Sequence, residues 1–356
     1  MASATLSAAA CCVIGVVSDT KIEFSALREP LVLTGEMSEI LLLGGTGWLG
    51  REIARAAVSA GNHVTCLARG ESGSVPDGAV LVRADRSTPG AYDAVARREW
   101  DDVIEVSWDN RLVLGALDAL APRTAHWTLV STISVYASNA TAGADESAGV
   151  VEPTDLSDYG QAKVAAERAS AEALGDRLLT ARAGLICGPG DPSDRFGYWV
   201  ARMAARPTAD ILSPQLEGRS VQAIDVRDLA AWIVSANSDT GVVNAIGAQY
   251  AFAEVLDRAA ASAGYTGARV EASDDWLIEH DVGYWAGPRS LPLWLPREDA
   301  AMAKRSDRAF VAAGGNRRDL SATLDDVLAD ERERGLDRPR RAGLDRGAEQ
   351  ALLREV

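Results

Sequence analysis

Lysine, histidine and cysteine are all scarce in this chain of 356 residues. The four cysteines, Cys11, Cys12, Cys66 and Cys187, give neither a disulfide framework nor a zinc-binding spacing. We therefore expect a reducing, cytoplasmic location. The three histidines lie far apart in the sequence, so we expect structural roles for them and infer no metal site. They are His63, His126 and His280.

Basic clusters and long apolar segments are also missing. The net charge is −15, and no run of Lys and Arg offers a surface for nucleic acid. The apolar stretch 5–17 is too short to span a bilayer, and no positive charge precedes it as in a secretory signal. We expect no nucleic acid and no membrane partner, but a small-molecule substrate. Because Met37 stands just before the first strong strand, residues 1–36 are interpreted as a leader or disordered tail.

What is present is an alternation of apolar strands and helices that begins at Ser38. Strands at this spacing, separated by helices, predict an α/β protein with a Rossmann-type doubly wound parallel sheet. The predicted strands are 40–43, 63–68, 79–82, 103–106, 127–131 and 178–186, and the predicted helices are 47–60, 112–120 and 158–174.

The alternation breaks after Gly188, where residues rich in Pro, Gly and aromatics suggest an inserted segment of loop and helix. A further strand and helix at 221–234 return to the first domain. We therefore predict a dinucleotide-binding domain of residues 37–187 plus 221–247. A smaller C-terminal substrate-binding region comprises residues 188–220 plus 248–340, and residues 341–356 form a C-terminal tail.

A glycine-rich loop follows the first predicted strand. Three glycines spaced as Gly44, Gly47 and Gly50 arise by chance about 0.2–0.3 times per chain, so this spacing alone is weak evidence for a dinucleotide site. Its position between a buried strand and an amphipathic helix favours a dinucleotide site. There the glycines allow a tight turn, close approach of pyrophosphate and close helix packing, while helix N–H groups face the phosphates. The candidate residues are Gly44, Thr46, Gly47, Trp48, Leu49 and Gly50.

The end of the second predicted strand bears on the choice of cofactor. NAD sites usually place a carboxylate there, but this strand ends in Cys66-Leu67-Ala68-Arg69. Arg69 can meet a 2′-phosphate through a forked, charge-assisted contact, which favours NADP over NAD. The alternative is that Arg69 is a solvated loop arginine.

Tyr159 and Lys163 stand four residues apart near the start of the long predicted helix, so both side chains lie on one face. With three lysines in the chain, any Tyr-x-x-x-Lys arises by chance only about 0.06 times. Bringing the pKa of a tyrosine from about 10 to about 7 takes roughly 4 kcal/mol, which an ammonium and an oxidised nicotinamide favour. The pair thus predicts proton transfer coupled to hydride chemistry, unless it is an ordinary surface pair.

Hydroxyl groups end the fifth predicted strand, where the ligand crevice of a parallel sheet lies. Thr132 and Ser131 are the candidates for orienting a substrate oxygen, although either hydroxyl can instead cap the strand end. Four further residues either line a substrate pocket or serve as packing. They are Arg195, Tyr198, Trp199 and Trp285.

These residues together resemble the extended short-chain dehydrogenase/reductase family of the NAD-dependent epimerase/dehydratase type, over about residues 38–245. The resemblance rests on the glycine loop, on segments 131–136, 182–191 and 222–230, and on Tyr159 and Lys163. It implies that Thr132, Tyr159 and Lys163 are catalytic and that the substrate is sugar-derived. It also implies a homodimer formed through the helices after strands four and five. The cofactor neighbours it implies are Asp85 near the adenine, Ser107 along the cofactor and Ala183 at the nicotinamide.

One departure from the family narrows the chemistry. Its dehydratases carry an Asp-Glu pair directly after the strand-five threonine, where this chain has Ile133 and Ser134. Dehydration is therefore disfavoured. The strand-five segment and residues 191–199 are more similar to an atypical branch that includes RNA-binding relatives, but the charge of −15 argues against RNA.

Three functions follow from these patterns. The first is an NAD(P)-dependent oxidoreductase that transfers hydride at a hydroxyl or carbonyl carbon, with Tyr159 as general acid/base. The alternative is a nucleotide-sugar epimerase that retains its cofactor. The third is a non-catalytic dinucleotide-binding protein.

Overall fold

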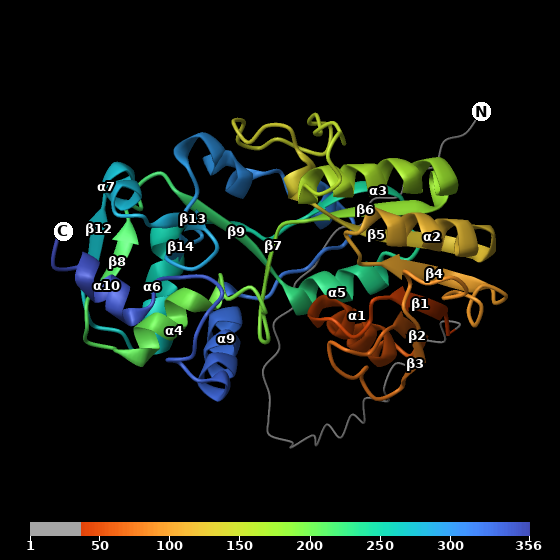
Figure 1. Ribbon diagram of the computed structural model, residues 1–356, viewed down its shortest axis with the longest axis horizontal. Helices are drawn as coiled ribbons and strands as arrows, with labels where there is room; N and C mark the ends of the chain where they lie inside the picture. The colour runs from red at the N-terminus through yellow and green to blue at the C-terminus, as the bar shows by residue number, and fades with distance from the viewer. Residues whose placement is uncertain (1–36) are drawn as a thin grey trace, which may run out of the picture. The chain divides into compact units, whose positions relative to one another are not determined.

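Seven parallel strands form the central sheet of residues 37–356, the part of the chain that the computed structural model describes (Figure 1). The strand order is β10-β6-β5-β4-β1-β2-β3, which confirms the predicted doubly wound sheet. The prediction for residues 1–36, Cys11 and Cys12 included, lies outside the described residues. The strands are β1 (Glu39–Leu43), β2 (His63–Ala68), β3 (Ala79–Arg83), β4 (Trp100–Glu105), β5 (Thr124–Thr132), β6 (Leu178–Ala183) and β10 (Gly241–Ala245).

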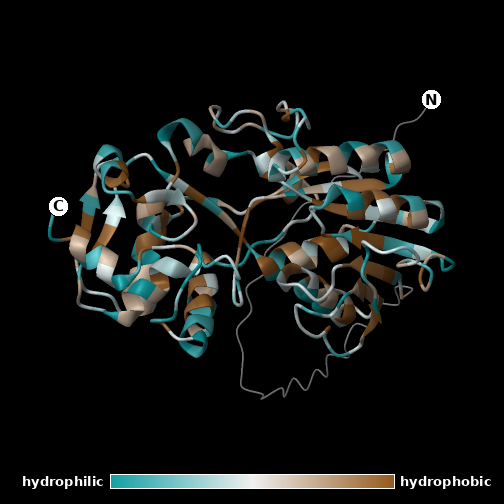
Figure 2. Ribbon diagram, viewed as in Figure 1, coloured by the Kyte–Doolittle hydropathy of each residue, from teal (hydrophilic) through white to brown (hydrophobic). Residues whose placement is uncertain are grey.

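Two pairs of helices cover the two faces of this sheet. Helices α1 (Trp48–Ser59) and α5 (Val226–Ser235) pack together on one face, and α2 (Asn110–Leu120) and α3 (Tyr159–Leu174) pack together on the other (Figure 1). The sequence of β1 shows why helices pack on both faces of the sheet. Ile40 and Leu42 enter the core on the α1 side, while Leu41 and Leu43 enter the core beneath α2 and α3. A strand buried on both faces must be apolar throughout, as Figure 2 shows for the centre of the sheet.

The sixth strand is shorter than predicted, because the stretch 178–186 breaks at Gly184. A Cβ at Gly184 would lie 2.9 Å from Cγ2 of Ile246, so the chain turns there at a close contact. Beyond the break, β7 (Leu185–Cys187) leaves the central sheet. It pairs with β9 (Ser220–Asp225), which also pairs with β11 (Gln249–Ala251).

Residues 221–234 therefore return to the first domain only in part. Helix α5 packs on α1 as part of the sandwich, but β9 belongs to the second sheet. The strand that completes the central sheet is β10, which pairs with β6 and which the sequence analysis missed.

The C-terminal region forms its own apolar core from α4, α6 and α9, with Trp199 and Phe252 in edge-to-face contact. Its elements are α4 (Gly197–Ala205), β8 (Ile211–Pro214), α6 (Phe252–Ala263), β12 (Arg269–Ala272), α7 (Asp274–Glu279), β13 (Gly283–Trp285), β14 (Ser290–Pro292), α8 (Arg308–Ala312), α9 (Leu320–Arg334) and α10 (Arg346–Leu352). Short 3₁₀ helices are η1 (Ala121–Arg123), η2 (Ile133–Val135), η3 (Gly175–Arg177) and η4 (Arg297–Lys304).

The predicted C-terminal tail is part of this region rather than a separate segment. Leu352 of α10 is buried in the core, and the buried carboxylate of Glu349 pairs with Arg202 of α4. Buried apolar and charged groups thus attach the last residues to the fold. Among residues 37–356, no helix is long and apolar enough to cross a membrane.

Each of the three histidines contacts other residues of the fold. The ring of His126 lies between Asp102 (2.9 Å) and the carbonyl of Asp239 (2.7 Å), at the amino ends of β4 and β5. His63 contacts Glu39, and His280 stacks on Trp276. Within the described range, no three His, Cys, Asp or Glu side chains are grouped to hold a metal ion.

Candidate active site

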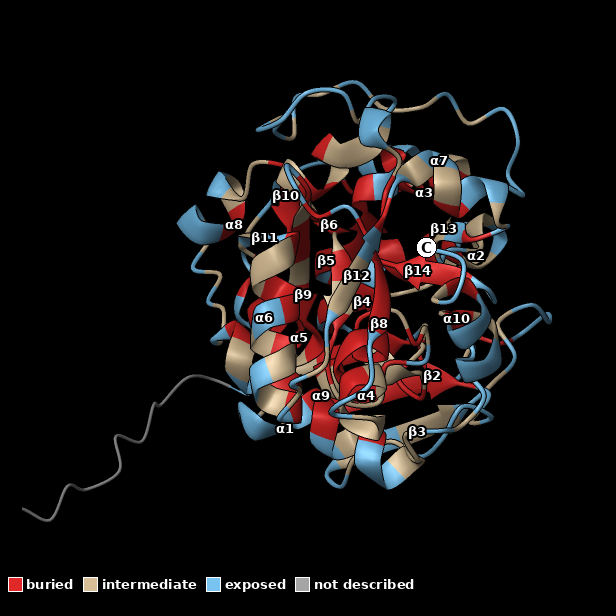
Figure 3. Ribbon diagram, turned by 90° about the vertical axis from the view of Figure 1, so that its left-hand side faces the viewer, coloured by how far each residue is buried: buried red, intermediate tan, exposed pale blue. Residues whose placement is uncertain are grey.

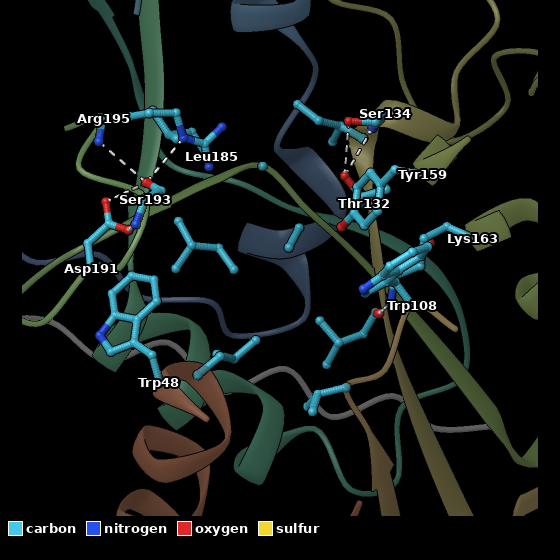
Figure 4. Close-up of a pocket in the computed structure, with 18 of the residues that line it drawn as sticks. Trp48, Trp108, Thr132, Ser134, Tyr159, Lys163, Leu185, Asp191, Ser193 and Arg195 are labelled. Atoms are coloured by element: carbon cyan, nitrogen blue, oxygen red, sulfur yellow. Dashed lines mark hydrogen bonds between the residues drawn. The ribbon is translucent and has the colours of Figure 1, made fainter. Parts of the chain in front are cut away.

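Two cavities lie at the carboxyl edge of the central sheet. The glycine-loop cavity, about 430 Å³, lies where β1, β2, β3 and β4 end. The tyrosine cavity, about 360 Å³, lies where β5 and β6 end and α3 begins, and Asp191, Ser193 and Arg195 line its opposite side (Figure 4). Val106 lines both cavities.

The predicted site residues divide between these cavities. The glycine-loop cavity is lined by Gly44, Thr46, Gly47, Arg69, Asp85 and Ser107. The tyrosine cavity is lined by Trp48, Leu49, Ser131, Thr132, Tyr159, Lys163 and Ala183. Gly50 lines neither cavity and has a packing role, because a Cβ there would lie 2.3 Å from the carbonyl oxygen of Gly44.

The glycine loop has the form that a dinucleotide requires. Gly44 has φ +108°, and a Cβ on it would lie 2.7 Å from Val106. Gly47 caps the N-terminus of α1, and a Cβ there would meet no other atom closer than 3.8 Å. Open space at the helix N-terminus, beside free N–H groups, suits a pyrophosphate. Trp48 joins this loop to the opposite wall, since its indole nitrogen donates to the carbonyl of Pro189 (2.8 Å).

Arg69 reaches the glycine-loop cavity together with a carboxylate that the sequence analysis missed. Its Nε lies 3.2 Å from a carboxylate oxygen of Glu71, and both side chains are exposed. Glu71 stands three residues after the end of β2, so inspection of the strand end alone did not reveal it. The cavity therefore presents both a cation and an anion near the expected ribose.

Asp85 also lines this cavity, but its carboxylate is held locally. It accepts hydrogen bonds from the amide (2.9 Å) and the hydroxyl (2.7 Å) of Ser87. The side-chain bond from Ser87 is the larger cause that lowers the pKa of Asp85. A carboxylate fixed in this turn can accept a hydrogen bond from a ligand and remains charged at neutral pH.

A buried ion pair beneath the glycine-loop cavity was also missed. Arg86 and Glu105 form a two-pronged contact, and Glu105 accepts the amide of Ser107 at 2.8 Å. The pair fixes the end of β4, where Ser107 lines the cavity. The sequence feature that could have revealed this ion pair is Glu105, a carboxylate inside a buried strand, because a buried charge requires a partner.

Tyr159 is the first residue of α3, and Asp158 caps this helix by accepting the amide of Gln161 at 2.9 Å. The next residue must be glycine, because a Cβ at Gly160 would lie 2.6 Å from the carbonyl oxygen of Ser134. This close approach brings the Tyr159 ring beside Thr132 (Figure 4). The residue is 45% exposed, but desolvation of its hydroxyl raises the pKa of Tyr159, while the Thr132 hydroxyl and the charge of Arg195 act in the opposite direction.

Lys163 is buried below Tyr159, and its contacts differ from those expected. Its ammonium donates to the carbonyl of Ser107 (2.8 Å) and to the carbonyl of Val130. Burial lowers the pKa of Lys163 to about 8, although the charges of Glu105 and Glu167 oppose this shift. The lysine thus joins β4 to β5 and places a positive charge at the floor of the tyrosine cavity.

The two strand-five hydroxyls have different partners. Ser131 donates to the buried carboxylate of Glu167, which also binds Arg182 through both of its oxygens. Thr132 accepts the amide of Ser134 at 3.1 Å, donates to the Ser134 hydroxyl at 3.2 Å and turns toward Tyr159 (Figure 4). Of the two strand-five hydroxyls, Thr132 is therefore the one that a ligand in the cavity can reach without competing with a buried carboxylate.

Of the four aromatic and arginine candidates in the C-terminal region, two line the tyrosine cavity. These are Arg195 and Trp285, and the guanidinium carbon lies 5.3 Å from the indole centroid. Tyr198 and Trp199 are instead buried in the C-terminal core and do not line that cavity. Trp108 was missed; it follows Ser107 and meets the Tyr159 ring edge-on, with centroids 6.3 Å apart.

The depressed pKa of Lys163 gives a prediction that needs no substrate. The folded protein releases this proton near pH 8, whereas the unfolded chain holds it up to pH 10.5. The penalty for burying the charge is full below pH 8 and is relieved as the pH rises. We expect the free energy of unfolding of the wild type, relative to Lys163→Met, to rise by up to about 3 kcal/mol between these values. Denaturant titrations of both proteins across this range measure it; a constant difference would contradict a buried, charged Lys163.

The sheet and the two cavities at its carboxyl edge define a dinucleotide-binding protein of the Rossmann type. A model of the NAD dependent epimerase/dehydratase family matches residues 40–245, more than half of the chain. The chain belongs to this family, and NAD(P) is the cofactor that the family and its solved structures indicate.

Comparisons with individual proteins are more distant. The chain is 32% identical to a 2′-dehydrokanamycin reductase of Streptomyces kanamyceticus over 178 residues, 47% of this chain and 49% of the relative. It thus spans about half the length of that curated relative. Among solved structures, UDP-glucuronic acid 4-epimerase from Bacillus cereus in complex with NAD is 14% identical, with TM-score 0.60, covering 83% of this chain and 99% of the other. RMD from Pseudomonas aeruginosa complexed with NADPH is 18% identical, with TM-score 0.58 over 84% and 100%. At these identities the two structures show the fold alone.

Proposed function

We propose that this protein is an NAD(P)-dependent oxidoreductase that transfers hydride at a hydroxyl or carbonyl carbon, with Tyr159 as general acid/base. The observation that supports this most is the grouping of Thr132, Tyr159 and buried Lys163 in one cavity, adjoining a second cavity fitted to a dinucleotide. The predicted catalytic residues are separated by up to 31 positions in the sequence, so the fold is needed to gather them.

Each residue has a definable task in this reaction. When bound, NAD(P) supplies or takes up the hydride. The open N-terminus of α1 at Gly47 would hold the pyrophosphate, and Thr132 would orient the substrate oxygen. In reduction, the Tyr159 hydroxyl gives its proton to the carbonyl oxygen; in oxidation, its phenolate takes the hydroxyl proton. The charge of Arg195, which acts on Tyr159, and the charge of Lys163 at the cavity floor would stabilise that phenolate.

A nucleotide-sugar epimerase with retained cofactor is the second candidate, and the matched NAD dependent epimerase/dehydratase family supports it. The 32% identical reductase favours net reduction instead, and its name supports a sugar-derived substrate. Dehydration is disfavoured because Ile133 is a buried apolar side chain and Ser134 carries no acid.

The test of the proposed function is a survey of carbonyl and hydroxyl compounds, sugars included, with NADPH, NADH and their oxidised forms. Net change at the reduced-nicotinamide absorbance band supports an oxidoreductase. Isomerisation of a nucleotide sugar without that change, by protein purified with its nucleotide bound, supports the epimerase. If neither occurs with any compound, the third reading, a non-catalytic dinucleotide-binding protein, gains.

The preference for NADP rests on Arg69. If Arg69 binds a 2′-phosphate, Arg69→Ala should weaken NADPH binding by about tenfold and leave NADH binding unchanged. This loss is at the low end for a hydrogen bond to a charged group, because the Arg69 side chain is exposed. Glu71→Ala should act in the opposite direction and favour NADPH, because it removes a carboxylate beside Arg69. Calorimetric titrations of both variants with both nucleotides measure these effects. Equal losses for NADH and NADPH in Arg69→Ala would count against the 2′-phosphate contact.

We also propose the division into a dinucleotide-binding domain and a substrate-binding region, a cytoplasmic location, and a homodimer. Asp191, Ser193, Arg195 and Trp285, from the predicted substrate-binding region, line the tyrosine cavity and support its assignment to substrate. A cytoplasmic location fits the unpaired, buried Cys66 and Cys187. A homodimer through α2 and α3 is supported by the exposed Leu114 on α2. Sedimentation of Leu114→Glu against the wild type tests the dimer.

A further inference from the structure

A third cavity lies in the C-terminal region and shares no lining residue with the other two. We call it the arginine cavity. It measures about 410 Å³ and lies between α4, the residues after β13 and the segment that leads into α10. Figure 3 looks onto the end of the molecule that carries these elements. Six arginines line it, against two carboxylates, in a chain whose net charge is −15: Arg202, Arg206, Arg289, Arg338, Arg340 and Arg346.

Buried carboxylates behind the cavity wall fix three of these guanidinium groups. Glu331 binds Arg338 (3.2 Å) and Arg340 (2.8 Å), Asp194 also binds Arg338, and Glu349 binds Nε of Arg202. These three acids are almost fully buried. At the cavity surface, Asp337 lies 3.6 Å from Arg206. Because a guanidinium carries five N–H donors in a rigid fork, these ion pairs can leave other donors of the same group unpaired.

Some of those donors lack partners. Nε of Arg338 and Nη1 of Arg340 are buried and have no hydrogen-bond acceptor among residues 37–356. A buried charged donor without an acceptor is costly, and a bound water, ion or ligand can satisfy it. At the rim, exposed Arg346 and Arg289 add charge, and Arg289 is held by the carbonyl of His280 at 2.8 Å.

We propose that the arginine cavity binds a phosphorylated small molecule. Forked pairs between arginine and phosphate are shorter and stronger than neutral hydrogen bonds, and several arginines converge here on one concave surface. The volume falls within the range of about 300–1,000 Å³ typical of small-molecule sites. This site is separate from the one that holds NAD(P), so the proposal does not depend on the proposed function.

The test is a calorimetric titration with inorganic pyrophosphate of the full chain saturated with NADPH, so that the glycine-loop cavity is occupied. We expect saturable binding with Kd below about 1 mM. The variant Arg289→Glu/Arg346→Glu reverses two rim charges without breaking the buried ion pairs. It should weaken pyrophosphate binding at least about tenfold and leave NADPH binding unchanged, which also shows that it is folded.

The matched control is Arg332→Glu/Arg354→Glu, which makes the same charge change on two exposed arginines of the C-terminal region, outside the cavity. It should bind pyrophosphate within about twofold of the wild type. Absence of saturable binding to the wild type would overturn the proposal. So would equal weakening by the control, because the effect would then come from overall charge, or undiminished binding by the rim variant.

Discussion

Replacing Tyr159 with phenylalanine is expected to lower kcat by about 10²–10⁴-fold and to leave NAD(P)H affinity nearly unchanged. The substitution removes the proton-transferring hydroxyl but keeps the ring, which packs edge-on against Trp108 at 6.3 Å. The loss should therefore appear in the chemical step rather than in binding. The measurements are kcat and KM for a carbonyl compound that the wild type reduces, with a parallel titration of NAD(P)H.

Tyr250→Phe is a suitable control, because Tyr250 lies outside both the glycine-loop and the tyrosine cavity. It should retain wild-type kcat. If Tyr159→Phe also retained it, Tyr159 would not be the general acid/base, and the non-catalytic reading or another proton donor would have to replace it.

Removing the carboxylate of Glu167 should destabilise the protein by about 3–5 kcal/mol, because Glu167→Ala leaves the guanidinium of Arg182 buried without its partner. Both side chains are buried, and Arg182 reaches both carboxylate oxygens, at 3.1 and 2.8 Å. The same change also frees the hydroxyl of Ser131 at the end of β5. Denaturant titration at neutral pH measures the loss.

Two comparisons separate burial from charge. Glu152→Ala breaks an equally well-formed pair with Arg168, but both side chains are exposed, so we expect little change in stability. The double variant Glu167→Leu/Arg182→Met replaces the buried pair with apolar groups and should recover part of the loss. If Glu152→Ala and Glu167→Ala cost the same, the buried pair would have no special role in holding β5 and β6 against α3.

Much of the central sheet could be predicted because its strands are buried on both faces and therefore read as uninterrupted apolar runs. The exceptions have physical reasons. The break at Gly184 depends on a contact with Ile246, some 60 residues away, which no local pattern reveals. Strand β10 was missed because its first two residues are exposed at the sheet edge and only five residues pair. The segment 341–356 is held by Glu349 and Leu352, whose partners lie on other elements.

The candidate site likewise has parts that local sequence patterns predict and parts that depend on contacts between distant residues. The glycine loop and the Tyr159–Lys163 spacing are local patterns, so the sequence placed them on one helix start and one helix face. The choice between Ser131 and Thr132 depends on Glu167, which no inspection of the strand reveals. Likewise, the separation of Arg195 and Trp285 from Tyr198 and Trp199 depends on how α4 packs.

The most direct test of the central claim is a calorimetric titration of nucleotide-free protein with NADPH and NADH, for the wild type and Gly47→Leu. Because a Cβ at Gly47 meets nothing closer than 3.8 Å, this substitution should fill the glycine-loop cavity without disturbing the fold. We expect one NAD(P)H per chain for the wild type and a loss of affinity of at least about a hundredfold for Gly47→Leu. Failure of the wild type to bind either nucleotide, or equally tight binding by folded Gly47→Leu, would contradict a dinucleotide site at this edge of the sheet.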